Sequence, residues 1–265
     1  PTIGENGIWM DATDKGCTFG KLPWYDQGLP ALVIGKGGEA LLKITYRDSA
    51  SSNHSRMNWK VNLNSDGSAI VQGKTQLWGV MASEMRADLL FSSQEEIRQW
   101  LEMHIAKRSI GTTLDSFKVN GLREIKDPLE ISFNFHSTGF ARKRSNQLIL
   151  QPGTVSLFEL PKLFRSRPRS YPIQFRFPFV QELKMEVQIP DSYQVAVSTF
   201  DDSLNTDFGS ATWTCSSSQD ALQLQVTYTL ARSHIAQDRY QDFLEFLREL
   251  QLKDQWEIML LPQNF

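Results

Sequence analysis

Apolar and polar residues alternate over several stretches of the chain, which predicts a protein built mainly of β-strands. Successive side chains of a strand point to opposite faces, so an apolar residue at every second position indicates one buried face. Asp66-Gly67 supplies a tight turn after the first such run, so residues 57–73 predict a β-hairpin. The run itself consists of Met57, Trp59, Val61 and Leu63.

Further strands are predicted along both halves of the chain. The longest candidate has apolar side chains at alternate positions from Leu222 to Leu230. Regular alternation also covers 183–189 and 193–197, on either side of the turn residues Asp191-Ser192. Other apolar runs predict strands at 29–34, 117–119, 129–135, 213–216 and 256–261.

Helical spacing occurs in three places. Residues 80–90 are only partly periodic, whereas the next helix begins at a capping box formed by Ser93 and Glu96. The clearest helix is predicted from Ile235 to Leu250, where apolar residues form one stripe. Together these patterns predict a mainly β (α+β) fold: an antiparallel, sandwich-like β region with two or three helices.

The composition limits the kinds of molecule that we expect this chain to bind. The 265 residues suit one large domain or two ordinary ones, and the formal net charge is only −2. Nucleic-acid sites are typical of domains with a net positive charge. The basic run Arg142-Lys143-Arg144 is therefore better explained as a solvated loop than as a nucleic-acid site. No apolar run approaches the roughly 20 residues that span a membrane. We expect neither a nucleic-acid partner nor a membrane span.

The cysteines and histidines predict no cofactor and no metal site. Cys17 and Cys215 lie far apart in the sequence, and two unpaired small residues are a simpler explanation than a disulfide. None of the histidines has metal-type spacing with another histidine or with a cysteine: His54, His104, His136 and His234. Asn53-His54-Ser55 fits a glycosylation sequon, although such a triplet often occurs by chance.

The N-terminal residues carry the most specific motif. The sequence runs through Trp9-x-Asp11-x-Thr13 and then Phe19-Gly20-x-Leu22-Pro23. This pattern resembles the closing segment of a transglutaminase-like, papain-type catalytic core. In that family a W-x-D-x-T strand presents the acidic member of a Cys-His-Asp triad, so the resemblance implies that role for Asp11.

Asp11 has two possible explanations. In the family role its carboxylate orients the catalytic histidine, which takes the proton of the cysteine thiol before that thiol attacks a carboxamide or peptide carbonyl. The alternative is an ordinary strand-end aspartate that shares a turn with Thr13 and Asp14. Only ten residues precede Asp11, so the cysteine and histidine of the family would lie upstream. Cys17 follows Asp11 in a loop, so we do not expect it to be the nucleophile.

Later segments extend the resemblance. They are similar to the C-terminal region of bacterial proteins that combine a DUF3857-type domain, a transglutaminase-like core and a DUF3858-type β domain. The matching residues are Asp66-Gly67-Ser68-Ala69, Arg86, Tyr171-Pro172-Ile173 and Ile189-Pro190-Asp191-Ser192-Tyr193. The resemblance implies three parts: a remnant of the catalytic core at 1–38, a β-rich domain with a helix at 39–146, and a β-rich domain with a C-terminal helix at 147–265. Residues 39–265 could also form one continuous domain.

The function expected from these features is that of an accessory or interaction region. It would be the C-terminal part of a transglutaminase-like cysteine protease or acyltransferase, catalytically incomplete by itself. Its partners would be the upstream catalytic core of the same protein and a peptide or protein substrate. The family implies a periplasmic or extracellular location. The alternative is an independent carbohydrate- or protein-binding β domain whose likeness to the triad segment is accidental.

Overall fold

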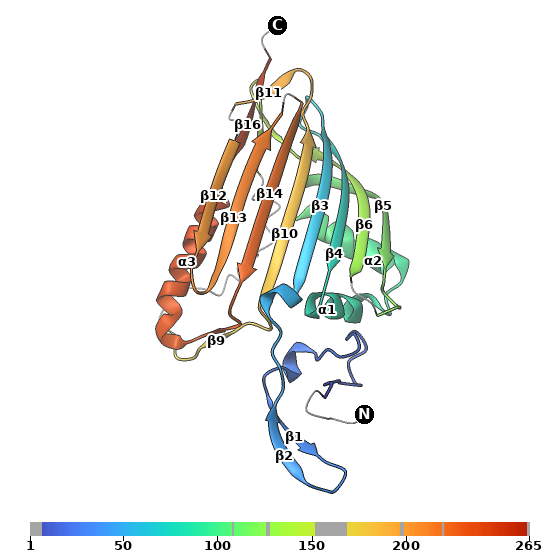
Figure 1. Cartoon of the computed structure of the whole chain (residues 1–265). Coiled ribbons are helices and arrows are strands. Elements are labelled where there is room, and N and C mark those ends of the chain that lie inside the picture. The colour runs from blue at the N-terminus through green and yellow to red at the C-terminus, as the bar shows by residue number, and fades with distance from the viewer. Residues whose placement is uncertain are drawn as a thin grey trace.

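An eight-stranded β-sheet forms the centre of the molecule (Figure 1). The structure is a computed structural model that describes residues 7–107, 109–125, 128–151, 169–196, 199–218 and 220–263. In sheet order the strands are β12 (Thr199–Asn205), β13 (Gly209–Ser217), β14 (Ala221–Leu230), β10 (Phe179–Gln188), β3 (His54–Leu63), β4 (Ala69–Leu77), β6 (Leu129–Gly139) and β5 (Ile110–Asn120). Neighbouring strands are antiparallel except in the middle, where β3 and β10 run parallel. The hairpin predicted at 57–73 is formed by β3 and β4.

The two faces of this sheet differ in polarity, as the alternation along the strands predicted. One face is apolar and buried: Trp59, Met185 and Trp213 are each at most 4% exposed. The opposite face carries exposed polar side chains such as Lys60 and Gln225. The sheet therefore needs a covering layer on one face only.

Helices supply part of that cover. The described chain contains α1 (Val80–Leu89), α2 (Gln94–Ala106) and α3 (Tyr240–Lys253), and α2 and α3 lie behind the sheet in the view of Figure 1. The predicted capping box of α2 is present. The Ser93 hydroxyl accepts a hydrogen bond from the Glu96 amide, and the Glu96 carboxylate accepts one from the Ser93 amide.

The C-terminal helix is integral to the core. Its predicted stripe, which runs from Tyr240 to Leu250, is buried against the sheet. Beyond its last turn, Asp254 accepts hydrogen bonds from the Trp213 indole at 2.8 Å and from the Tyr228 hydroxyl. The helix begins later than predicted, because Ile235 belongs to the short strand β15 (His234–Ile235), which pairs with β9 (Ile173–Gln174).

A second sheet completes the fold. Its order is β11 (Tyr193–Val195), β16 (Ile258–Pro262), β8 (Gln147–Leu150) and β7 (Arg142–Arg144). Leu148, Leu150 and Leu260 of this sheet join the same buried cluster as the eight-stranded sheet. The mainly β, α+β and sandwich-like fold class is therefore confirmed.

The basic run Arg142-Lys143-Arg144 was wrongly predicted as a loop. It forms strand β7, because Ser145 adopts a left-handed φ of 54° and turns the chain back into β8. Arg142 also pairs with Glu257 at 3.0 Å. The backbone hydrogen bonds of this short hairpin outweigh the high polarity of its sequence.

One buried asparagine joins three elements of the fold. The side chain of Asn53 donates a hydrogen bond to the Pro178 carbonyl at 3.0 Å, and its backbone carbonyl accepts one from Val180 at 3.0 Å. Its side-chain oxygen accepts a hydrogen bond from the Val80 amide at 2.9 Å and so caps α1, whose own N-cap, Gly79, has no side chain. Asn53 is 0% exposed, so its amide is inaccessible to glycosylation in the folded chain despite the sequon.

The residues before β3 form a separate small layer below the sheet in Figure 1. They include the 3-10 turns η1 (Trp24–Asp26) and η2 (Ala50–Ser52) and a hairpin of β1 (Pro30–Ile34) with β2 (Ala40–Ile44). Gly35–Gly38 make its turn. The proposed domain limit at 38 falls in this turn, and the limit at 146 falls between the paired strands β7 and β8. The division into domains remains a prediction.

Replacing Phe243 by alanine tests the role of α3. Phe243 is 0% exposed and its ring packs against Phe175 and Phe208, so the change should lower the free energy of unfolding by about 3–5 kcal/mol. Leu252→Ala on the same helix is the control: Leu252 is 69% exposed, so its loss should change stability by less than about 0.5 kcal/mol. Equal effects in urea unfolding would contradict the placement of this helix.

Candidate functional site

Asp11 lies in an irregular segment. The strand that the family motif implies is not formed at residues 7–23, because no described strand pairs with this stretch. The Asp11 carboxylate instead accepts hydrogen bonds from the amide of Thr13 at 2.8 Å and from its hydroxyl at 2.7 Å. These bonds hold the pKa of Asp11 below its usual value.

Other acidic groups surround Asp11. Burial, followed by the charge of Asp11, raises the pKa of Asp26. Tyr25 donates a hydrogen bond to Asp14 at 3.2 Å, and burial together with the Asp14 charge raises the pKa of that phenol to about 12. Within the described residues, no three His, Cys, Asp or Glu side chains are arranged as a metal site requires.

Each of the four histidines contacts a residue other than Asp11. His54 stacks on Trp78, and His104 bonds the Trp100 carbonyl. His136 pairs with Asp115, and His234 bonds Gln174. None of these contacts brings an imidazole to Asp11, so within the described residues no histidine is oriented by that carboxylate.

Cys17 sits where its thiol is held protonated. Burial, followed by the charge of Asp14, raises the pKa of Cys17 to about 12. Cys215 lies in β13 facing the core, and burial raises its pKa to about 11. Both cysteines are free thiols, as predicted. Neither environment is that of a catalytic nucleophile.

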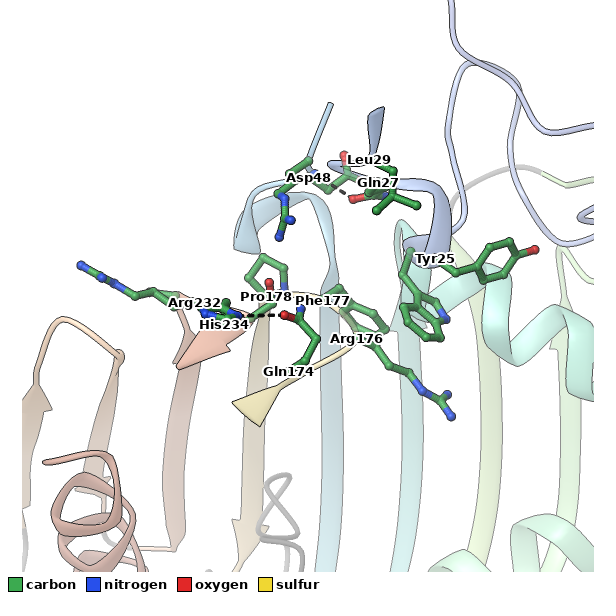
Figure 2. A pocket seen from close by; sticks show the side chains of 14 residues that line it. Tyr25, Gln27, Leu29, Asp48, Gln174, Arg176, Phe177, Pro178, Arg232 and His234 are labelled. Atoms are coloured by element: carbon green, nitrogen blue, oxygen red, sulfur yellow. Dashed lines mark hydrogen bonds between the residues drawn. The ribbon is translucent and has the colours of Figure 1, made fainter. Parts of the chain in front are cut away.

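The structure reveals a cleft that the sequence did not indicate. Its volume is about 570 Å³, and it lies between the N-terminal layer and the lower end of the sheet. Figure 2 shows Gln27, Leu29 and Asp48 on one side and Gln174 and His234 on the other. The two sides are more than a hundred residues apart in the chain, which explains why no local motif marked the site.

The N-terminal wall is held rigid by reciprocal hydrogen bonds. The Gln27 amide nitrogen donates to the Asp48 carboxylate at 3.0 Å, and the Asp48 backbone amide donates to the Gln27 side-chain oxygen at 2.9 Å. Lys21 pairs with the same carboxylate at 3.1 Å. Gly28 adopts a φ of +70° beneath the Arg47 side chain, where a Cβ would lie 2.0 Å from Arg47 Nε.

Arg176 connects the walls. Its guanidinium lies 5.5 Å from the Trp24 ring centroid and pairs with Glu84 of α1 at 2.9 Å. Arg47 and Arg232 also line the cleft. Arg232 lies 3.7 Å from Asp207, whereas Arg47 has no carboxylate partner among the described residues. Three arginines and the aromatic residues Trp24 and Phe177 thus line the cleft.

Comparison with known proteins gives a family match for one part of the chain. A family model described as a domain of unknown function with a solved structure, DUF3858, matches residues 146–260. A DUF3858 domain is therefore present. No curated protein and no solved structure gave a significant match.

The DUF3858 segment begins just before β8 and ends within β16. It includes β10, β12, β13 and β14, which form one half of the eight-stranded sheet. The other half, from β3 to β6, lies before the matched residues. None of the described helices is long and apolar enough to span a membrane.

The pKa of Cys17 predicts slow alkylation. At pH 8 a thiol with a pKa of about 12 is ionised to only roughly one part in 10⁴, so iodoacetamide should modify Cys17 at least about 100-fold more slowly in the folded chain than in urea. Folding raises the pKa of Cys17, so the protonated thiol favours the folded state. This contribution to the free energy of unfolding is fully present below the pKa of the unfolded thiol and is lost as the pH rises through the pKa of the folded thiol. Mass spectrometry of a Cys215→Ser variant measures the rate. Equal rates in the two states would show that Cys17 is reactive.

Proposed function

We propose that this chain is a non-catalytic accessory region of a transglutaminase-like protein and that its cleft binds an acidic peptide or protein segment. The observation that carries this proposal is that three arginines, Arg47, Arg176 and Arg232, and the aromatic residues Trp24 and Phe177 line the 570 Å³ cleft. An exported location, periplasmic or extracellular, belongs to the same proposal and rests on the family resemblance.

The charge of the cleft favours a carboxylate-bearing ligand. Arginine presents several N–H groups in one plane and binds carboxylates through paired hydrogen bonds. Arg47 has no carboxylate partner among the described residues, and Arg232 has only a long contact to Asp207. The rings of Trp24 and Phe177 can pack against apolar side chains of the same ligand.

A non-catalytic role agrees with the surroundings of the triad-like residues. Asp11 is hydrogen-bonded to Thr13, and the Cys17 thiol is protonated at neutral pH. In the parent protein Asp11 would complete a triad with the cysteine and histidine of the upstream core. In this chain it has no such partner among the described residues.

The β1–β2 hairpin supports a contact with that upstream core. Its cross-strand pairs place Leu32, Ile34 and Leu42 on one face, where they are 63%, 69% and 67% exposed. A two-stranded hairpin is marginally stable alone, and an exposed apolar face of this kind is typical of an interaction surface. We propose that the catalytic core covers this face.

The second candidate function is carbohydrate binding. It is favoured by Tyr25, which is 46% exposed and lies edge-to-face with Trp24 at 5.7 Å, and by the amides of Gln27 and Gln174, which line the same cleft. Aromatic rings next to amide groups suit the apolar faces and hydroxyls of sugars. A neutral sugar, however, would leave Arg47 without a carboxylate partner, whereas Arg176 pairs with Glu84 and Arg232 lies near Asp207.

Binding of defined ligands separates these candidates. An N-acetylated, C-amidated pentapeptide with four glutamates and one phenylalanine should bind the chain with an affinity that falls as salt increases. The double variant Arg47→Gln/Arg232→Gln should bind it about tenfold or more weakly, because charge-assisted hydrogen bonds contribute about 1.5–3 kcal/mol each. Isothermal titration calorimetry measures both. Arg176 is left unchanged because it also holds Glu84 and Trp24 in place.

The matched control is Arg144→Gln, on the exposed edge strand β7 of the second sheet. It should leave peptide affinity unchanged. Equal binding of the corresponding glutamine peptide, or an unaffected double variant, would overturn the acidic-peptide proposal. Tight binding of neutral oligosaccharides would support the second candidate, and turnover of an amide or ester by the purified chain would overturn the non-catalytic role.

A further inference from the structure

A second cavity lies in the β region, and Phe177 lines both this cavity and the arginine cleft. Its volume is about 350 Å³, and it is bounded by the apolar face of the sheet, by α1 and by α2. This volume lies at the lower end of the roughly 300–1,000 Å³ that is usual for small-molecule sites.

The walls of the cavity are apolar and adaptable. The sheet contributes Met57 and Phe133, while α1 contributes Met81 and Met85. Methionine side chains are unbranched and polarizable, so they adjust to ligands of irregular shape. Gly73, the cross-strand partner of Phe133, leaves room for the Phe133 ring, which a Cβ at that position would approach to 2.0 Å.

Three polar atoms on the sheet side lack a hydrogen-bond partner. They are Ser55 Oγ, Trp59 Nε1 and Gln181 Oε1, each buried and without a partner among the described residues. All three residues line the cavity, and Ser55 and Trp59 are only 2% and 3% exposed. Burying such groups unpaired costs free energy, so native proteins usually pair them with protein, water or ligand.

The positions of these atoms indicate the shape of a ligand. Ser55 of β3 is the register partner of Gln181 of β10, so the two side chains are neighbours on one face. Trp59 lies four residues further along β3, so its Cα is about 13 Å from that of Ser55 at the usual rise of a strand. A molecule that pairs with all of them must be elongated and carry a donor near Gln181 and an acceptor within reach of the Trp59 indole.

The charge around the cavity indicates that this ligand is neutral. The residues that line it include no lysine or arginine, whereas Glu84 and Asp88 contribute two carboxylates from α1. Glu84 is paired with Arg176, and Asp88 is exposed at the rim. A fatty acid would bring a third carboxylate to this site, whose lining contains the imidazole of His104 but no lysine or arginine to balance it. A hydroxyl or ester group meets the same hydrogen-bonding needs without charge.

We propose that this cavity binds an uncharged, elongated amphiphile: an apolar chain with a hydroxyl-bearing head that pairs with Ser55 and Gln181 and an acceptor that pairs with Trp59. The apolar chain packs among Met81, Met85 and the ring-bearing side chains of α2 that line the cavity, Trp100 and His104.

The experiment titrates the full chain with 1-monolauroylglycerol, below its micelle concentration, and follows the indole N–H cross-peak of Trp59 by NMR. A Trp59→Phe variant assigns this cross-peak. The cross-peak should shift saturably, and laurate, which has the same chain and a carboxylate head, should bind at least tenfold more weakly. No shift with monolauroylglycerol, or equal binding of laurate, would overturn the proposal.

A pair of variants tests the hydrogen bonds. Gln181→Leu removes an unpaired buried oxygen, so it should weaken monolauroylglycerol binding about threefold to tenfold while leaving the thermal midpoint of the free protein equal or higher. Gln225→Leu, on the exposed face of β14, should change neither quantity. Ser55→Ala provides the same binding test if Gln181→Leu does not fold. Unchanged affinity in the Gln181 and Ser55 variants would overturn the assignment of the head group.

Discussion

The parallel pairing of β3 with β10, fixed at its start by Asn53, is the constraint on which the rest of the structure depends. These strands are the only parallel neighbours among the described strands of the large sheet. They join the segment before residue 146 to the DUF3858 domain. Through its hydrogen bonds to Pro178, Val180 and Val80, Asn53 sets the register of both strands and the start of α1 together. A shift by one residue would move each apolar side chain of β10 to the solvent face.

Both candidate binding regions are built around this junction. Asp48 precedes β3, and Phe177 and Pro178 precede β10, so the arginine cleft lies directly before the paired strands. Ser55 and Gln181 follow the same junction inside the sheet and belong to the second cavity. The position of α1, capped by Asn53, also sets Glu84, which pairs with Arg176 of the cleft and lines the cavity. One buried amide therefore positions residues of both sites.

Local features of the fold were predictable from the sequence, whereas long-range pairing was not. The β3–β4 hairpin, the Ser93 capping box and the buried stripe of α3 each depend on residues close together in the chain. The pairing of Ser55 with Gln181 joins residues 126 positions apart, and no local pattern encodes it. Strand β7 was missed because its three basic residues have no apolar face to reveal it.

The candidate site was less predictable still. Asp11 stood out because its motif is short and contiguous, while the cleft draws on residues near 24, 47, 176 and 232. Gln181 looks like any polar residue before the alternation that starts at Leu183, and Asn53 looks like a sequon. Only the assembled sheet shows that the side-chain oxygen of Gln181 has no hydrogen-bond partner among the described residues and that Asn53 has several. The family role of Asp11 and the limits of the domains remain predictions.

Native-state hydrogen exchange of the Asn53→Ala variant tests the central role of this junction most directly. The substitution leaves the Val80 amide and the Pro178 carbonyl without the side chain that pairs them, which should cost about 2–5 kcal/mol. We expect the amides of β3, β4, β10 and β14 to lose protection together and by the same free energy. Loss of protection confined to the residues around position 53, or restricted to one side of the β3–β10 pair, would contradict this account.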